Sequence, residues 1–453
     1  MAADWRETTL GEVIELKRGY DLPQQHRTRG RVPLVSSSGV TDYHSVAMVK
    51  GPGVVTGRYG TLGQVFFVSE DYWPLNTTLY VRDFKGNDPR FISYFLQELD
   101  FLAYSDKAAV PGLNRNHLHQ AQVRVPSHID EQRAIAHILG TLDDKIEVNR
   151  RMNETLEAMA LVLFKSWFID FDPVRRNAAQ GRNQPSPPTP LPGGAGRNAQ
   201  SRNQPSPSAS RHPLPLGNGR GEGVVAGEAY DHLFPDSFED SELGEIPKGW
   251  KTRSLYETAE FINGAAFKSE DFCDPVQGLP VVKIAELKDG ISAQTKFSMR
   301  LLDPKQWIET GELLYSWSGS PDTSLDAFLW TKGRGLLNQH IFKVVTPTIS
   351  EKRFVYYLLK FLRSTLVEIA RNKQTTGLGH VTVADMKRLH VCSPPLTVLA
   401  AFDHQVAPLF DRAFKSTLES QTLATLRDTL LPKLISGELW VPHLTYIAGS
   451  HKP

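Results

Sequence analysis

The chain contains two copies of one sequence pattern, and this duplication limits its possible folds more than any other feature. The segment WRETTLGE at 5–12 has a counterpart, PKGWKTRSL, at 247–255. The segment RFISYFL at 90–96 returns as RFVYYLL at 353–359, and each copy is followed by a long helical pattern. Two copies are too few for a solenoid, which needs at least three repeats to bury a continuous core. The pattern therefore predicts a duplicated globular unit, each copy followed by a helix, with pseudo-two-fold symmetry.

Length and composition restrict the class of protein. A chain of 453 residues with 40% hydrophobic residues is long enough for two or more domains, each with its own core. A formal net charge of +1 argues against a non-specific DNA coat, although it allows local basic groups. Cys273 and Cys392 are the only cysteines, which excludes a disulfide framework and a cysteine-based zinc site. We find no apolar signal core and no run of about 18 apolar residues, so we expect a soluble, cytoplasmic protein that does not enter a membrane.

The globular units are expected to be of the α+β type. In residues 1–125, short β-type runs alternate with Gly, Asp and Pro turns, and one helix is expected at 89–104. The second unit spans 246–392, with the matching helix near 352–369. The stretch at 173–245 is rich in Pro, Gly, Ser and Arg and poor in apolar side chains, so we expect a largely disordered linker.

Two heptad patterns predict long helices at 126–172 and 393–438, followed by a tail at 439–453. Every seam position of the second helix lies 267 residues after its counterpart in the first. Gly140 and Pro408 are expected to weaken or kink the two helices at nearly corresponding places.

Both helical seams are polar at their centres. The polar positions are Asn149, Asn153, Ser416 and Ser420. We interpret them as devices that fix the register of the helix pair, because a buried polar layer tolerates only one alignment. Parallel and antiparallel pairing both align these layers. The duplication favours antiparallel helices, which place Asn149 opposite Ser420 and Asn153 opposite Ser416.

Three motifs in and around these helices are those of a known family. They are PSHIDEQRAI at 126–135, LFKSWFIDFDPV at 163–174 and LLPKLISGEL at 430–439. Together they resemble the specificity subunit of type I restriction–modification systems, and the similarity covers nearly the whole chain except the Pro-rich linker. That linker is longer than the family pattern. The second helix also lacks the Glu-Gln pair found at Glu131 and Gln132 of the first.

The resemblance implies a fold and a function. The fold is two target-recognition domains of mixed α/β type, separated by two long antiparallel coiled-coil helices. Each domain would read one half of a bipartite, asymmetric site on double-stranded DNA. The helices would set the spacing and dock two methyltransferase subunits, and motor and nuclease subunits would join for restriction. The chain itself would be non-catalytic and hold no cofactor, while S-adenosylmethionine would bind the methyltransferase partners.

The residues of the chain give no sign of catalytic chemistry. No Asn/Asp-Pro-Pro-aromatic tetrad of an amino-methyltransferase is present, and GRYGTLG at 57–63 has neither dinucleotide-binding nor P-loop spacing. The histidines lack metal-ligand spacing, and we interpret His117 and His119 as surface or strand residues. We therefore predict neither a catalytic nor a metal site.

The side chains that contact DNA are mainly Arg, Lys, Asn, Gln and Ser, and these residue types gather at glycine-flanked loops of both units. The candidates in the first unit are Arg27, Arg29, Arg31, Arg58, Tyr59, Asn114, Arg115 and Asn116. The candidates in the second unit are Ser316, Trp317, Lys373, Gln374 and His380. Any single one is compatible with an ordinary solvated loop. The alternative function is a coiled-coil adaptor with two protein-binding domains, for which exposed apolar anchors would be expected instead. A nuclease is disfavoured, because the metal-binding carboxylates are missing.

Overall fold

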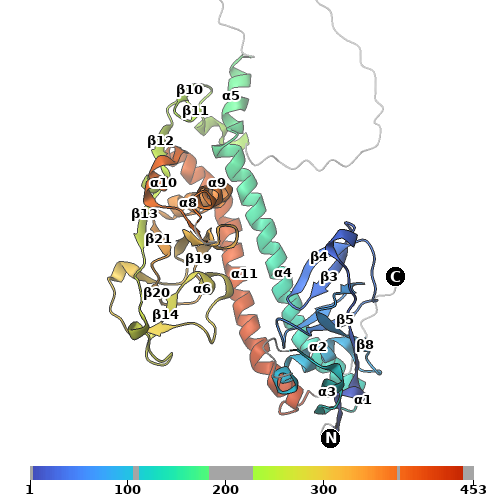
Figure 1. Ribbon diagram of the computed structural model, residues 1–453. Helices are drawn as coiled ribbons and strands as arrows, with labels where there is room; N and C mark the ends of the chain where they lie inside the picture. The colour runs from blue at the N-terminus through green and yellow to red at the C-terminus, as the bar shows by residue number, and fades with distance from the viewer. Residues whose placement is uncertain (1–3, 106–111, 183–227, 375–377, 442–453) are drawn as a thin grey trace, which may run out of the picture. The chain divides into compact units, whose positions relative to one another are not determined.

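The computed structural model describes residues 4–105, 112–182, 228–374 and 378–441 (Figure 1). The chain divides into two compact units, Met1–Met152 with Ser416–Pro453, and Asn153–Lys415. The long helices α4 (Ile129–Phe168) and α11 (Leu396–Ser436) each contribute one part to each unit. Within the described residues, none of the helices combines the length and the apolar character needed to cross a membrane.

The first unit contains two sheets and a terminal strand pair. The main antiparallel sheet has the order β2 (Glu15–Arg18), β8 (Thr78–Asp83), β5 (Gly53–Gly57), β6 (Val65–Val68). The second has the order β4 (Gly39–His44), β3 (Val32–Ser36), β7 (Trp73–Pro74), with β3 and β7 parallel. Strand β1 (Trp5–Thr9) pairs antiparallel with β9 (Gln122–Pro126). The short helices are α1 (Leu10–Val13), α2 (Pro89–Gln97) and α3 (Arg115–His119).

Helix α2 forms where the sequence predicts it but is shorter than expected. The carboxylate of Asp88 accepts the backbone N–H of Phe91, and Pro89 occupies the first turn, so the start of the helix is capped. The helix ends at Gln97. Asp100 then caps a separate 3-10 turn at Phe101–Tyr104, so the predicted helix of 89–104 is two elements.

The second unit repeats this topology and adds to it. Its central antiparallel sheet has the order β13 (Glu260–Asn263), β21 (Ile341–Val345), β17 (Leu313–Ser316), β19 (Asp326–Leu329). A second sheet has the order β15 (Phe297–Ser298), β14 (Leu279–Val282), β20 (Gly335–Leu337), β16 (Trp307–Ile308). Three strand pairs complete it: β12 (Lys251–Ser254) with β23 (His390–Ser393), β18 (Ser318–Gly319) with β22 (Gly379–His380), and β10 (Phe238–Ser241) with β11 (Gly244–Pro247).

The helices of the second unit surround these sheets. They are α5 (Asp172–Arg182), α6 (Ile284–Asp289), α7 (Pro321–Ser324), α8 (Ile349–Phe361), α9 (Arg363–Arg371) and α10 (Val383–Arg388). The helix predicted near 352–369 is therefore two helices, α8 and α9, which meet at Leu362.

The strand orders confirm the duplication. The β2-β8-β5-β6 sheet corresponds to β13-β21-β17-β19, and β1-β9 corresponds to β12-β23. The parallel pair β3-β7 corresponds to the parallel pair β14-β20. Both units are of the expected α+β type, and each closes with a long helix.

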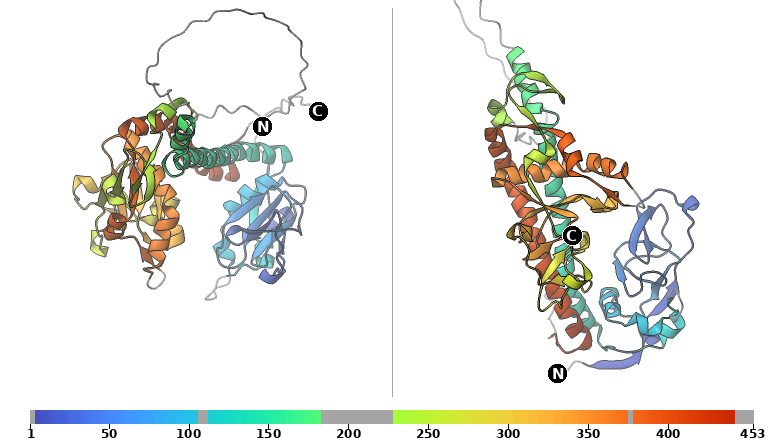
Figure 2. Two further views of the ribbon diagram at one scale, coloured as in Figure 1. Left: turned by 90° about the horizontal axis from the view of Figure 1, so that it is seen from above. Right: turned by 60° about the vertical axis from the view of Figure 1, so that its left-hand side comes forward.

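The two long helices run antiparallel within each unit, as Figures 1 and 2 show. In the first unit, the Asn149 side-chain amide donates to the Ser420 hydroxyl at 3.2 Å, and Arg427 pairs with Asp143 at 2.7 Å. Residue numbers therefore fall along α11 as they rise along α4. In the second unit, the Phe164 and Trp167 rings both lie 6.0 Å from that of Phe402.

The predicted contact between Asn149 and Ser420 is confirmed. The Trp167–Phe402 ring contact likewise agrees with antiparallel pairing. Arg427, a polar residue at a seam position of α11, is accommodated by its ion pair with Asp143 of α4. Both helices continue without a break through Gly140 and Pro408. Ser416 is buried in the first unit, whereas Asn153 is the first residue of the second.

The expected linker at 173–245 contains ordered structure at both ends. Helix α5 extends the chain to Arg182, and residues from Glu228 onward form a 3-10 turn followed by the β10–β11 hairpin. The ends are ordered because their few apolar side chains are buried. Phe234, for example, lies 5.1 Å from the ring of Trp167, and Arg176 pairs with Asp231 at 2.7 Å. Residues 183–227, which hold most of the Pro-rich sequence, lie outside the described residues, as do 442–453 of the expected tail.

Candidate nucleic-acid interface

In the first unit, two loops that are distant in sequence lie side by side. Strand β5 ends at Gly57, and the next residue, Arg58, donates its backbone N–H to the Thr77 carbonyl at 2.8 Å. The Arg58 carbonyl in turn accepts the N–H of Leu113 at 3.0 Å, and Tyr59 forms a β-bridge with Gly112. The main sheet therefore presents the Arg58 loop and the start of α3 together.

Glycines make this close approach possible. A Cβ at Gly112 would lie 2.5 Å from a ring carbon of Tyr59, and a Cβ at Gly57 would lie 2.0 Å from the Thr61 carbonyl oxygen. Both distances are shorter than real Cβ contacts, so a side chain at either position would force the loops apart. Gly57 of the GRYGTLG segment and Gly112 thus allow backbone segments to approach closely.

The half-buried Arg58 and the exposed Tyr59 lie against each other. The Arg58 guanidinium lies 4.6 Å from the centroid of the Tyr59 ring, and its Nη2 donates to the Tyr59 hydroxyl at 3.3 Å. The ring is 42% exposed. Stacking restricts the guanidinium before any partner arrives. A fork of this kind suits either the O6 and N7 acceptors of guanine or a phosphate.

Some side chains of helix α3 make structural contacts, whereas others are exposed on the surface. Asn114 caps the helix, because its Oδ1 accepts the backbone N–H of Asn116 at 3.0 Å. Arg115 and the Asn116 side chain are exposed. His119 is structural, since its Nε2 accepts the Leu16 N–H at 2.9 Å. Burial, followed by the charge of Arg115, lowers the pKa of His119 and so favours the neutral acceptor form.

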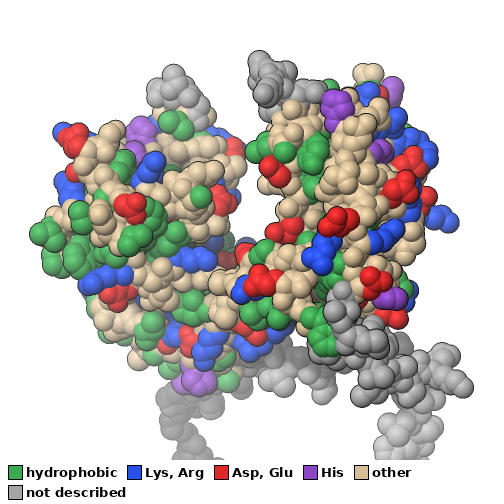
Figure 3. Space-filling model, turned by 90° about the horizontal axis from the view of Figure 1, so that it is seen from below, with side chains coloured by type: hydrophobic (Ala, Val, Ile, Leu, Met, Phe, Trp, Pro, Cys, Tyr) green, Lys and Arg blue, Asp and Glu red, His purple; other side chains and the backbone are tan. Residues whose placement is uncertain are grey.

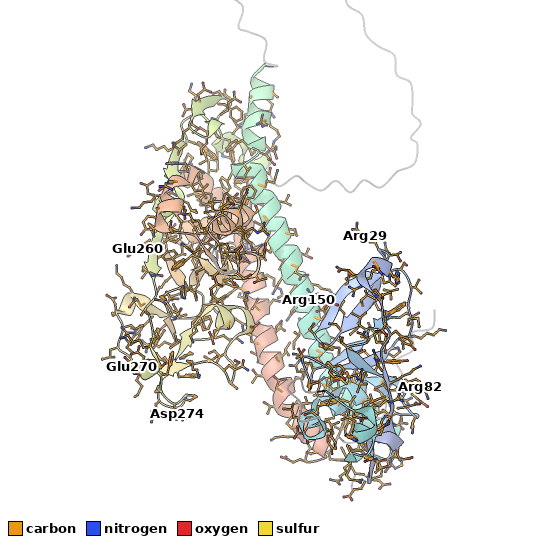
Figure 4. The ribbon with its side chains drawn as sticks, viewed as in Figure 1. Arg29, Arg82, Arg150, Glu260, Glu270 and Asp274 are labelled. Atoms are coloured by element: carbon orange, nitrogen blue, oxygen red, sulfur yellow. The ribbon has the colours of Figure 1, made fainter. Side chains whose placement is uncertain are left out.

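The basic group before β3 is only partly available. Arg27 pairs with Asp42 at 3.3 Å and is mostly covered. Arg29, which is labelled in Figure 4, and Arg31 are exposed. The alternating arginines of the sequence therefore divide into one structural and two solvent-facing groups.

The second unit pairs the corresponding loops. The Trp317 carbonyl, just after β17, accepts the N–H of Val381 at 2.9 Å, and Ser318 pairs with His380 between β18 and β22. Trp317 stacks 5.7 Å from the Phe342 ring, and its Nε1 donates to the Asn263 Oδ1 at 3.3 Å. The backbone arrangement is that of the Arg58 loop, with an aromatic side chain where the first unit has a cation.

The other predicted residues of the second unit are less available. Ser316 is fully buried at the end of β17, so it has no surface to offer DNA. Lys373 binds both carboxylate oxygens of Asp385, at 2.6 and 2.7 Å, and Asp385 also accepts the Thr382 N–H. Gln374 is exposed, and His380 is half-buried.

The prediction from sequence missed three polar residues next to Trp317. Asn263, at the end of β13, and His340 are exposed, and Gln339 is half-buried with its Nε2 3.3 Å from the His340 Nε2. Asn76 of the first copy matches Asn338 of the second in the sequence, and this match would have directed attention to the loop. Asn338 holds a turn, because its Oδ1 accepts the His340 N–H at 3.4 Å, whereas the Asn76 amide donates to Asp21 of a segment distant in sequence.

The surface charges of the described residues are mixed. On the face drawn in Figure 3, Lys and Arg are interspersed with Asp and Glu and do not merge into one large basic area. Among the described parts of the chain, no group of three or more His, Cys, Asp or Glu residues could hold a metal ion. The chemistry available at the loops is therefore that of hydrogen-bond donors, acceptors and stacking rings.

Comparisons with known proteins agree with this arrangement. The family model described as the type I restriction modification DNA specificity domain matches residues 2–158 and 247–427, which are the two copies. The chain is 25% identical over 479 residues to the type I restriction enzyme MjaIX specificity subunit of Methanocaldococcus jannaschii, covering 97% of this chain and 95% of that one. It is 23% identical to the HindI specificity subunit of Haemophilus influenzae, covering 96% and 100% of the two chains.

A solved structure shares the fold. The S subunit of a type I restriction–modification system from M. genitalium matches with a TM-score of 0.54 at 15% identity, covering 95% of this chain and 96% of that one. The family model accounts for well over half of the sequence and for both of its repeats. The chain therefore belongs to the type I restriction–modification DNA specificity family, whose members are the recognition subunits, not the catalytic subunits, of their enzymes.

Proposed function

We propose that each unit reads one half of a bipartite, asymmetric site on double-stranded DNA. One observation carries the proposal: the same pair of loops lies beside the end of the same strand in both units, with different side chains. Tyr59 beside Gly112 corresponds to Ser318 beside His380. Two domains that read unlike half-sites need the same backbone arrangement but different hydrogen-bonding side chains.

The two long helices would set the distance between the half-sites and dock two methyltransferase subunits. Several apolar side chains on α4 face solvent, including Met159 at 54% and Val162 at 70% exposure. Exposed apolar side chains on one element suggest a protein partner. The methyl donor, S-adenosylmethionine, would bind those partners, and motor and nuclease subunits would join for restriction.

Methylome sequencing tests the reading of DNA. The chain is expressed with its methyltransferase subunits in cells that lack other methyltransferases, and the methylated positions are mapped. We expect one asymmetric motif with a non-specific gap of several base pairs, because two readers on one face of B-DNA lie about one helical turn, roughly 34–36 Å, apart. The same cells without this chain should show no such motif. A continuous motif, or none, would contradict the proposal.

Docking is tested separately by Val162→Glu. We expect this variant to lose co-purification with the methyltransferase subunit, because a buried charge is costly at an apolar interface. The matched control is Val276→Glu, which changes an equally apolar side chain that is 94% exposed in a loop away from the helices. Equal binding by both variants would assign the docking surface elsewhere.

A further inference from the structure

One arginine ties each recognition domain to the long helix that follows it, at the same place in both copies. Arg90 of α2 and Arg353 of α8 are the first residues of the repeated segments RFISYFL and RFVYYLL. Arg90 donates to both carboxylate oxygens of Asp144 on α4, at 2.5 and 3.0 Å. Arg353 donates to Asp411 on α11 at 2.8 Å.

The duplication preserves both ends of this ion pair. Asp411 lies 267 residues after Asp144, which is the offset that relates all seam positions of the two helices. Neither aspartate belongs to the seam, so the hydrophobic repeat does not explain why both positions are acidic. The feature that the two carboxylates share is an arginine of the adjoining recognition domain.

We call this contact between an arginine and an aspartate the arginine clamp. In the first unit, the clamp explains why a glycine lies in the middle of a long helix. The Arg90 Nη2 also donates to the Gly140 carbonyl at 3.0 Å, and a Cβ at Gly140 would lie 2.5 Å from the guanidinium. A glycine in the middle of a helix is less favourable than an alanine. That cost is offset here by the close approach of the arginine, which also lies 5.8 Å from the Phe67 ring.

In the second unit, the clamp is more deeply buried. The Arg353 side chain is 9% exposed, against 32% for Arg90. It makes a second ion pair, with Asp403 at 2.8 Å, and lies 5.3 Å from the Phe410 ring. Both arginines thus combine an aspartate of the spacer helix with an aromatic face.

We propose that Arg90 and Arg353 are positioning residues, which fix the orientation of each recognition domain on its helix and so make the complex selective for the gap between half-sites. The inference rests on the proposed function. Apolar contacts between domain and helix are non-directional. A guanidinium fork held by a carboxylate is directional, so it opposes rotation of the domain about the helix.

The test uses the complex with its methyltransferase subunits and DNA substrates whose gap is the cognate length or one base pair longer or shorter. For Arg90→Gln, we expect discrimination against the altered gaps to fall by roughly two- to fivefold, the range typical of one partly exposed ion pair. The sequence of each half-site should remain unchanged, which a general loss of folding would not permit. The control is Arg82→Gln, which removes an ion pair with Glu15 in the same unit; Arg82 is labelled in Figure 4.

A charge-exchange variant distinguishes the loss of the ion pair from misfolding. The double variant Arg90→Asp with Asp144→Arg restores the ion pair but not the contact with Gly140, so we expect it to recover part of the lost gap discrimination. Unchanged discrimination in Arg90→Gln, or an equal loss in Arg82→Gln, would overturn the clamp and leave the proposed function intact. A wild-type complex without any gapped motif would overturn both.

Discussion

The loop clusters of the two recognition domains share a hydrogen-bonding frame but differ in chemistry. The first presents two cations, Arg58 and Arg115, and the second presents the Trp317 ring with neutral polar neighbours. The one lysine predicted for the second cluster, Lys373, is held by Asp385. Backbone pairings and the arginine clamp are thus retained between the copies, while the surface side chains have diverged. On the proposed function, a duplicated recognition domain can therefore change the sequence that it recognises while it keeps its fold.

Exchanging a whole recognition domain should have the largest effect. If residues 1–125 are replaced by the same segment of a relative, we expect one half of the methylated motif to change completely, because each recognition domain has its own set of hydrogen-bonding side chains. The other half and the gap should be retained, since the second unit and the helices are untouched. Methylome sequencing measures this. A change in both halves would show that the two domains do not read independently.

Arg58→Ala should weaken discrimination at one base pair of the first half-site. A guanidinium bound to a base edge is worth about 1–3 kcal/mol of discrimination. If Arg58 binds phosphate instead, affinity should fall for all sequences, and the salt dependence should become less steep. Competition binding of the complex at several salt concentrations separates the two cases.

A parallel test in the second unit is Gln339→Ala, a substitution in the loop beside Trp317. It removes a neutral donor, so we expect a loss of specificity at the other half-site with no change in salt dependence. A reduced salt slope in this variant would contradict the division into a cationic and a neutral reader. Unchanged affinity and specificity in Arg58→Ala would return that residue to an ordinary solvated loop.

Lys373→Met should destabilise the second unit instead of altering recognition. The substitution leaves the nearly buried Asp385 carboxylate without its cation, and we expect a loss of about 1–2 kcal/mol at neutral pH after allowance for the partial exposure of Lys373. The control is Lys305→Met, whose partner Glu260 is well exposed, and which should cost less. Urea unfolding measures both. An equal cost would mean that the Lys373 pair is an ordinary surface pair.

The effect of Lys373→Met should depend on pH. Burial raises the pKa of Asp385, but hydrogen bonds from Lys373 and Thr382 outweigh it and bring the pKa down to about 2, from an ordinary value of 3.8. The folded state therefore gains stability from this carboxylate above about pH 4 and loses it as the pH falls toward 2. The stability difference between Lys373→Met and the wild type should shrink over that range.

Sequence patterns predicted the parts of the structure that depend on local periodicity. The duplication, the two helices and the contact between Asn149 and Ser420 follow from repeated apolar and polar positions. The loop at Arg58 was found because glycines mark a turn. The burial of Ser316 and the pairing of Lys373 with Asp385 could not be found in this way, because they depend on tertiary packing. The same holds for Arg90 and Asp144, whose contact joins segments that no local pattern connects.

The smallest expected effect concerns the helix pair, which also differs between the units. In the second unit, aromatic rings such as Phe164 and Phe402 fill the seam, whereas the first has a polar layer at Asn149. The Asn149 amide donates to the Glu419 carboxylate at 2.9 Å as well as to Ser420. In Asn149→Leu, Glu419 keeps Lys145 at 3.5 Å, and the Ser420 hydroxyl keeps the Ser416 carbonyl at 2.9 Å. Few partners are lost, so we expect equal or slightly higher thermal stability.

We expect Asn149→Leu to loosen the register of the helix pair, because leucine fits an apolar seam equally well after a slip of one heptad. Cysteine crosslinking can detect this in a background without Cys273 and Cys392. The native register lies between the contacts of Asp143 with Arg427 and of Asn149 with Ser420, so Ile146→Cys should crosslink with Leu423→Cys. Ile146→Cys with Leu430→Cys reports the slipped register and should crosslink appreciably only when Asn149→Leu is also present. If the yields of both pairs are the same with asparagine and with leucine at 149, the polar layer does not set the register. The antiparallel pairing would then depend on the aromatic seam of the second unit and on the ion pair of Arg427.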